Sequence, residues 1–166
     1  MTRVLPLATA LVLVSISGAS AQAVRQLGEF RDWTAYTATE GTDPICFAMA
    51  RPLEVNPTPD GLTDAYVYLT HRPAEELRYE FNVVAGFTFA ADTPATVSVS
   101  GQSFDLFTEN DAAWLLDPAQ GQNLASAIRA GSSLIVDATT DKGIKVQETF
   151  SLSGATAASR AIDSEC

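Results

Sequence analysis

This chain of 166 residues has little of the side-chain chemistry that enzymes and metalloproteins usually need. It contains one histidine, His71, and only two cysteines, Cys46 and Cys166, which are far apart. A zinc site needs more ligands, and a thioredoxin-like redox site needs two closely spaced thiols. There is no GxSxG nucleophile elbow and no phosphate-binding glycine loop. We therefore expect no catalytic residues, no metal and no cofactor.

Basic residues are also scarce. Ten lysines and arginines stand against 20 acidic residues, which gives a formal net charge of −10. This balance argues against nonspecific binding to nucleic acid or anionic lipid, and we interpret it as a source of solubility. The acidic segment with Asp105, Glu109 and Asp111 lacks the ligand count and spacing of a calcium loop, so we expect a solvated turn there.

A long apolar run occurs once, at the amino end. Arg3 precedes an apolar stretch at residues 4–16, and the small residues Ala19 and Ala21 follow. This pattern predicts a secretory signal over residues 1–21, cleaved after Ala21. The run is shorter than the roughly 20 residues that span a bilayer. We expect residues 22–166 to form a single domain without a membrane span, located in the periplasm, on the outer surface or secreted.

In an oxidising compartment, a lone pair of cysteines most simply forms a disulfide. Strand alternation places Cys46 on one face with Ala48 and Ala50, and helical spacing over residues 154–165 directs Cys166 toward the core. We therefore predict a Cys46–Cys166 bond that fastens a terminal helix to a sheet.

Short alternating segments separated by turn residues dominate the rest of the chain. They favour a mainly β fold, an antiparallel β-sandwich or a partly open barrel. Helices are predicted at residues 118–130, where Asp117 can cap the start, and at residues 154–165. Residues 54–61 have loop chemistry. Strands are expected at residues 33–37, 45–50, 65–70, 79–85, 95–99, 104–107, 134–139 and 144–152.

Glu148 interrupts the apolar face of the last predicted strand, which also carries Val146 and Phe150. Burial of an unpartnered carboxylate is costly. We expect Glu148 to pair with an arginine, to lie at the rim of the sheet or to mark a bulge.

Several short motifs occur along the chain in a fixed order: FRDWTAY at 30–36, THRPAE at 70–75, VAGF at 84–87, SFDLFTE at 103–109, AGSS at 130–133 and FSLSG at 150–154. Their order and spacing resemble the invasion-associated locus B family of alphaproteobacterial exported proteins. The resemblance implies an exported envelope protein, and some family members are associated with host-cell invasion by pathogens. It supplies no catalytic residues. Trp33, His71 and Arg72 lie within these motifs, and with Trp114 they are candidate interaction or structural residues.

Three functions follow as hypotheses. The first is a non-enzymatic envelope protein that binds an envelope or host protein through a β-rich surface. The second is a periplasmic binder of a small molecule or glycan, with a cleft lined by Tyr66, Tyr68 and Trp114. The third, less favoured, is a small hydrolase that uses His71 or paired carboxylates.

Overall fold

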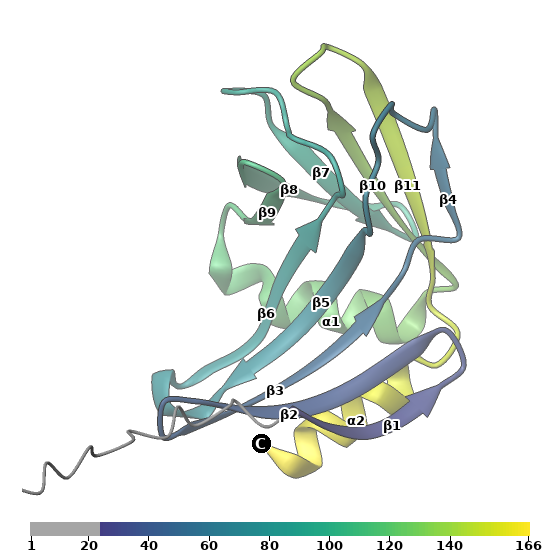
Figure 1. The fold of residues 1–166 in the computed structure, drawn as a ribbon. Coiled ribbons are helices and arrows are strands. Elements are labelled where there is room, and N and C mark those ends of the chain that lie inside the picture. The colour runs from purple at the N-terminus through teal and green to yellow at the C-terminus, as the bar shows by residue number, and fades with distance from the viewer. Residues whose placement is uncertain (1–23) are drawn as a thin grey trace, which may run out of the picture.

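The computed structural model describes residues 24–166, which form eleven strands and two α-helices (Figure 1). The predicted signal segment 1–21 lies outside the described residues, so its cleavage stays a prediction. The strands are β1 (Arg25–Phe30), β2 (Trp33–Glu40), β3 (Asp43–Ala50), β4 (Glu54–Asn56), β5 (Tyr66–Arg72), β6 (Leu77–Val84), β7 (Ala95–Val99), β8 (Gln102–Glu109), β9 (Ala112–Leu115), β10 (Ser133–Thr139) and β11 (Lys145–Ser151).

All eleven strands belong to one antiparallel sheet in the order β1-β2-β3-β5-β6-β9-β8-β7-β10-β11-β4. The sheet is strongly curved but not closed, and β1 and β4 are its edges. A single backbone bond from Asp32 N to Ser153 O (3.2 Å) links the β1–β2 turn to the residues after β11. The mainly β prediction is confirmed, and the architecture corresponds to its partly open form.

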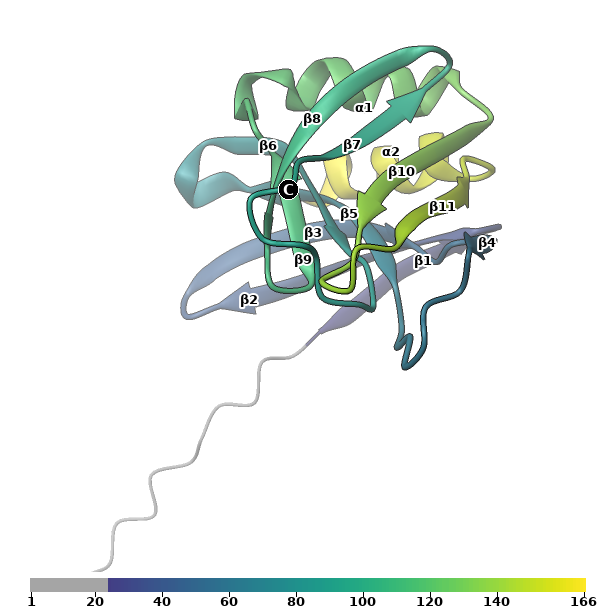
Figure 2. The ribbon, with the colours of Figure 1, turned by 90° about the horizontal axis from the view of Figure 1, so that it is seen from above.

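Both helices lie side by side on one side of the sheet (Figures 1 and 2). Helix α1 (Gly121–Ala130) packs against β6 and β7, and α2 (Ala155–Glu165) packs against β1, β2, β3 and β5. The predicted start of the first helix is a 3-10 turn, η2 (Pro118–Gln120), in which the Asp117 carboxylate accepts a hydrogen bond from Ala119 N at 3.0 Å. The predicted capping residue is therefore confirmed.

The sheet face under α2 is built from small residues. Cys46, Ala48 and Ala35 are fully buried there, and their short side chains let the helix approach the strands closely. Cys46 and Cys166 form a disulfide with a Cα–Cα distance of 6.0 Å. The predicted fastening of the terminal helix to the sheet is confirmed.

Three strands were not predicted. Residues 54–61 were expected to be loop, but β4 occupies their first three positions and pairs with β11, with Val55 opposite Glu148. Strands β1 and β9 also lie where no strand was expected. All three are short or polar, and they are ordered by pairing with longer neighbours rather than by their own alternation. No helix among residues 24–166 is long and apolar enough to cross a membrane.

Candidate functional site

The side of the sheet that faces away from the helices is the candidate site. On the helix side, alternate residues such as Ala48, Leu69 and Phe81 are buried in the core. Their neighbours in the same strands point outward and stay partly exposed across β2, β3, β5, β6, β9 and β8. No other described element lies over this outward side, and most of its side chains are partly exposed.

Register aligns the outward side chains in two rows across the sheet. One row runs Thr34, Met49, Tyr68, Asn82, Trp114, Phe107, and the other runs Tyr36, Phe47, Thr70, Glu80, in which Thr70 is buried. Tyr66 lies two positions from Tyr68 on the same side of β5. We call the six aromatic residues of this surface the outer aromatic face: Tyr36, Phe47, Tyr66, Tyr68, Phe107 and Trp114.

The rings of the outer aromatic face form two groups, a chain of four on β2, β3 and β5 and a pair on β8 and β9, and the rings within each group contact one another. Their centroids are 5.2 Å apart for Tyr36–Phe47, 6.1 Å for Phe47–Tyr68, 5.9 Å for Tyr66–Tyr68 and 5.5 Å for Phe107–Trp114. Aromatic pairs at such distances favour one another by about 0.5–1.5 kcal/mol beyond the area they bury. The face is therefore a pre-ordered surface, which would lose little side-chain entropy on binding.

A hollow of about 440 Å³ borders the outer aromatic face near the ends of β2 and β3, and Arg51 is among its lining residues. The Arg51 guanidinium donates to Asp64 (2.8 Å) and to the Tyr66 hydroxyl (2.6 Å), and it lies 4.7 Å from the centre of the Tyr66 ring. The hydrogen bond from Arg51 lowers the pKa of the Asp64 carboxyl. This end of the face offers a fixed cation and a carboxylate beside the rings.

A second hollow lies at the opposite end, where the sheet forks. Strand β9 pairs with β6 only as far as Asn82 opposite Trp114, and then leaves toward η2. The gap is a cavity of about 250 Å³, which we call the fork pocket. It is lined mainly by apolar side chains: Leu77, Glu80, Phe81, Phe107, Trp114, Leu115 and Pro118.

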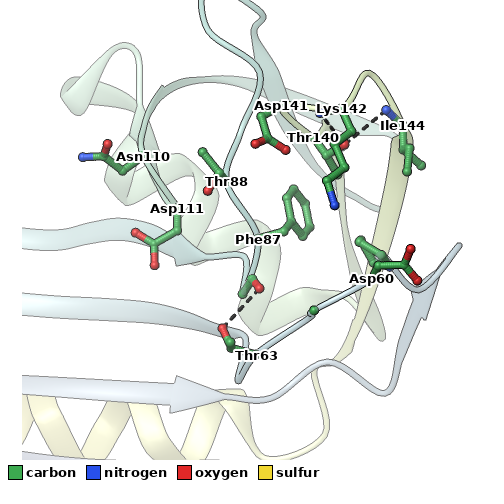
Figure 3. A pocket seen from close by; sticks show the side chains of 13 residues that line it. Asp60, Thr63, Phe87, Thr88, Asn110, Asp111, Thr140, Asp141, Lys142 and Ile144 are labelled. Atoms are coloured by element: carbon green, nitrogen blue, oxygen red, sulfur yellow. Dashed lines mark hydrogen bonds between the residues drawn. The ribbon is translucent and has the colours of Figure 1, made fainter.

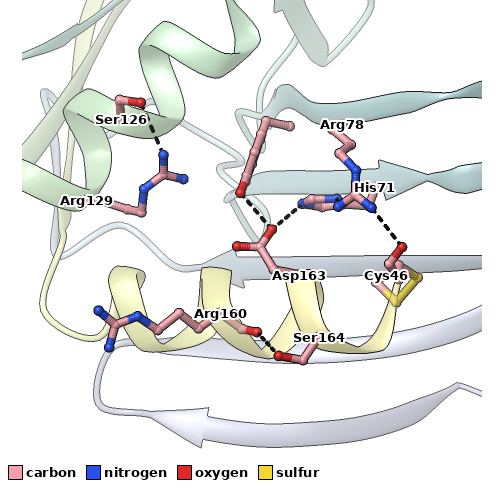
Figure 4. A network of polar contacts seen from close by, with 10 residues as sticks. Cys46, His71, Arg78, Ser126, Arg129, Arg160, Asp163 and Ser164 are labelled. Atoms are coloured by element: carbon pink, nitrogen blue, oxygen red, sulfur yellow. Dashed lines mark hydrogen bonds and ion pairs between the residues drawn. A yellow bond between two sulfur atoms is a disulfide. The ribbon is translucent and has the colours of Figure 1, made fainter.

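His71 lies on the helix side of β5 and is fully buried (Figure 4). Its Nδ1 is 3.1 Å from Arg78 Nη1, and its Nε2 is 3.4 Å from Asp163 Oδ1 on α2. The Tyr79 hydroxyl donates to the same Asp163 oxygen at 2.6 Å, and Arg78 also donates to the Cys166 carbonyl at 3.1 Å. These bonds surround the disulfide and hold the last turn of α2 on the sheet.

The chemistry of this cluster is that of a structural histidine. Burial lowers the pKa of His71; Asp163 raises it, and Arg78 lowers it further. A guanidinium can donate only to an unprotonated nitrogen, so Nδ1 is the acceptor and the proton is assigned to Nε2. Both ring nitrogens face protein groups, and a substrate cannot reach them in this arrangement.

The other two motif residues also hold the fold together. Trp33 is fully buried, and its Nε1 donates to Ser151 O on β11 at 2.9 Å. Arg72 donates to Glu40 (2.6 Å) and Glu80 (3.1 Å), and so ties three strands together. Of the four candidate residues, only Trp114 belongs to the outer aromatic face.

Glu148 is fully buried on the core side of β11, and neither carboxylate oxygen has a hydrogen-bond partner among residues 24–166. Its cross-strand neighbours are Val136 and Val55. Desolvation raises its pKa to about 8. The three expectations of an arginine partner, a rim position or a bulge were wrong, because strand β4 and the core exclude water from a regularly paired position.

A further cavity of about 380 Å³ opens among loops at one end of the sheet (Figure 3). Asp60, Asp111 and Asp141 come from three separate loops, with Phe87 and Lys142 between them. Among residues 24–166, no group of three or more His, Cys, Asp or Glu side chains is arranged to hold a metal ion. We assign this cavity no chemistry.

The predicted sandwich cleft lined by Tyr66, Tyr68 and Trp114 was wrong, because the described strands form one sheet and not two packed ones. The three lie on the same side of that sheet, but Tyr66 lines one hollow and Trp114 lines another. Tyr36, Phe47 and Phe107 were not predicted to join them. Alternation within each strand marks them as outward-facing, but only the strand order brings them together.

No protein-family model and no curated protein matches this sequence. Among solved structures, the chain is similar to the crystal structure of invasion associated protein B from Bartonella henselae. The TM-score is 0.55 at 15% sequence identity, and the match covers 88% of this chain and 97% of that chain. At this identity the similarity shows a shared fold, in agreement with the resemblance drawn from the sequence motifs.

Proposed function

We propose that this protein is exported, is not an enzyme, and binds a partner protein of the cell envelope or of a host through the outer aromatic face. One observation carries the proposal: six partly or fully exposed aromatic side chains, stacked as a group of four and a pair, lie on the side of the sheet that no described element covers. Aromatic residues are enriched in interface cores, and contiguous exposed apolar patches mark binding sites.

Export is supported by two features. The amino-terminal segment has the three parts of a secretory signal. The Cys46–Cys166 disulfide suits an oxidising compartment. The fold neighbour carries the name of an invasion associated protein, and by analogy of fold we propose a location in the periplasm or on the outer surface.

We find no accessible chemical centre in the part of the chain that the structure describes, and this supports a binding role. His71 is the sole histidine and is buried between Arg78 and Asp163. The carboxylates at the loop cavity come from separate loops. A hydrolase would need a nucleophile or a carboxylate pair that a substrate can reach.

Photocrosslinking in intact cells tests the proposal. A benzoylphenylalanine residue replaces Tyr68 at the centre of the outer aromatic face, and a matched protein carries it at exposed Arg160 on α2. We expect mass spectrometry to identify one protein in adducts from position 68 that is absent from position 160. Identical adduct patterns, or turnover of a defined substrate by the purified protein, would contradict the proposal.

A glycan is the second candidate occupant. The register row Tyr68, Asn82, Trp114 places an amide between two rings, and sugars bind to such alternating stacking and hydrogen-bonding groups. A thermal-shift screen against envelope oligosaccharides tests this candidate, because a ligand that binds the folded state raises its stability. A shift that disappears in Trp114→Ala would favour the glycan.

A further inference from the structure

The fork pocket combines an apolar interior with free acidic charge on β8, the strand that supplies one of its walls. Phe107 forms one wall and is 44% exposed. Asp105 and Glu109 flank it two positions away on the same side of β8, and both are exposed. Neither carboxylate has an ion-pair partner among residues 24–166, whereas Glu80 in the pocket wall is bonded to Arg72.

We propose that the fork pocket receives one leucine- or phenylalanine-sized side chain from a partner protein, in a segment where lysine or arginine flanks that residue. This inference rests on the proposed function and names the chemistry of the partner at one end of the outer aromatic face.

The size of the pocket restricts what can fill it. A cavity of about 150 Å³ already accommodates benzene, so about 250 Å³ suits one apolar side chain and is small for a drug-sized ligand. Anchors of this kind, inserted into a pocket at an interface, carry a large share of binding energy. The stacked Phe107–Trp114 pair holds the pocket wall in place before binding.

The acidic residues on β8 favour basic residues on either side of the inserted apolar side chain of the partner. Asp105 and Glu109 carry negative charge on either side of the wall residue Phe107 in β8, and the whole chain has a net charge of −10. A basic segment would gain attraction during encounter and in the complex, whereas an acidic one would be repelled. A basic segment without an apolar residue would leave the pocket empty.

The test is a titration of the oxidised protein with three peptides. NMR monitors binding through the amide chemical shifts of the protein. The probes are acetyl-Lys-Lys-Leu-Lys-Lys-amide, its Ser-centred analogue and acetyl-Glu-Glu-Leu-Glu-Glu-amide, each up to millimolar concentration. We expect only the first peptide, the basic leucine peptide, to shift the amide signals of Leu77, Phe107 and Trp114. These shifts should reach a plateau as the peptide concentration rises.

Two variants and two matched controls locate the binding. Phe107→Ala should lower the affinity for the basic leucine peptide by about fivefold or more. The double variant Asp105→Asn/Glu109→Gln should lower the same affinity by about two- to fivefold for each charge removed. Leu116→Ala removes a neighbouring leucine that is 62% exposed and outside the pocket, and Glu54→Gln removes a charge on β4. Neither control should change the affinity.

The outcomes separate this inference from the proposed function. No saturable binding of the basic leucine peptide, or equal binding of the three peptides, would overturn the inference. So would unchanged affinity in both pocket variants, provided their amide spectra show the native fold. If crosslinking at position 68 still captures one protein, the proposed function stands without the pocket. If only a glycan binds the outer aromatic face, both proposals fail.

Discussion

The guanidinium of Arg78, an exposed residue, donates a hydrogen bond across 3.1 Å to Nδ1 of the buried His71. A histidine that accepts this bond must be neutral, although it lies close to a carboxylate, Asp163. Burial and the neighbouring cation outweigh that carboxylate and lower the pKa of His71. The cluster holds α2 beside the disulfide, and it does so best when His71 is unprotonated.

Substitutions on either side of His71 should move its pKa in opposite directions. Arg78→Met removes a group that lowers the pKa, so the pKa should rise; Asp163→Asn removes the group that raises it, so the pKa should fall further. His71 is the only histidine, and NMR titration of its ring protons follows it without ambiguity. The same shift in both variants would contradict the electrostatic assignment.

The sign of the pH dependence follows from this lowered pKa. Below about pH 6.5, the unfolded chain binds a proton at His71 that the folded protein does not. The contribution of His71 therefore destabilises the fold as pH falls from 6.5 toward the pKa in the folded state. The variant His71→Phe should lack this pH dependence of the free energy of unfolding. Urea unfolding across the same pH range measures it.

Glu148→Gln should make the protein more stable at neutral pH. The folded-state pKa is raised from 4.5 to about 8, so the unfolded chain ionises first and stability falls as pH rises between these values. With 1.36 kcal/mol per pH unit, the difference between variant and parent should be about 3 kcal/mol at pH 7 and small near pH 4.5. Urea unfolding at several pH values measures it.

Glu54→Gln is the matched control for this effect, because Glu54 is exposed on β4 beside the same strand. Its unfolding free energy should follow the parent at every pH. A Glu148→Gln protein whose stability stays parallel to the parent from pH 5 to pH 8 would show that the buried carboxyl has found a partner.

Loss of the disulfide should cost a substantial part of the stability. Cys46 and Cys166 are 120 residues apart, and the chain-entropy relation gives about 4–5 kcal/mol for a loop of that length. The variant Cys46→Ala/Cys166→Ala should unfold at lower urea than the oxidised parent. Reductant should move the parent toward the variant and leave the variant itself unchanged; superimposed curves for all samples would contradict a stabilising bond.

Gly154→Ala should destabilise far more than Gly143→Ala. Both glycines have positive φ, +97° and +77°, so both substitutions carry backbone strain of about 1 kcal/mol. A Cβ atom on Gly154 would lie 1.6 Å from Phe30 O, whereas no atom of the described residues lies within 4 Å of one on Gly143. Thermal unfolding compares the two variants. Equal melting temperatures would show that β1 can move away from the start of α2.

Much of the fold was predictable because alternation and helical spacing are local. The small-residue face with Cys46 and Ala48, the capping role of Asp117 and the inward direction of Cys166 all follow from periods of 2 and 3.6 residues. Strand β4 was not predictable, because its three residues are ordered by pairing with β11. For the same reason, the sequence did not predict that the Glu148 carboxyl has no hydrogen-bond partner among residues 24–166.

The sequence by itself determined the mainly β class, the disulfide and which side chains of each strand point outward. The tertiary structure decided which of those side chains become neighbours. Tyr68 and Trp114 are 46 positions apart, and they share a row only because β6 lies between β5 and β9. Likewise, the fork pocket exists because β9 pairs with only part of β6. Strand order and register are non-local, and the candidate site depends on both.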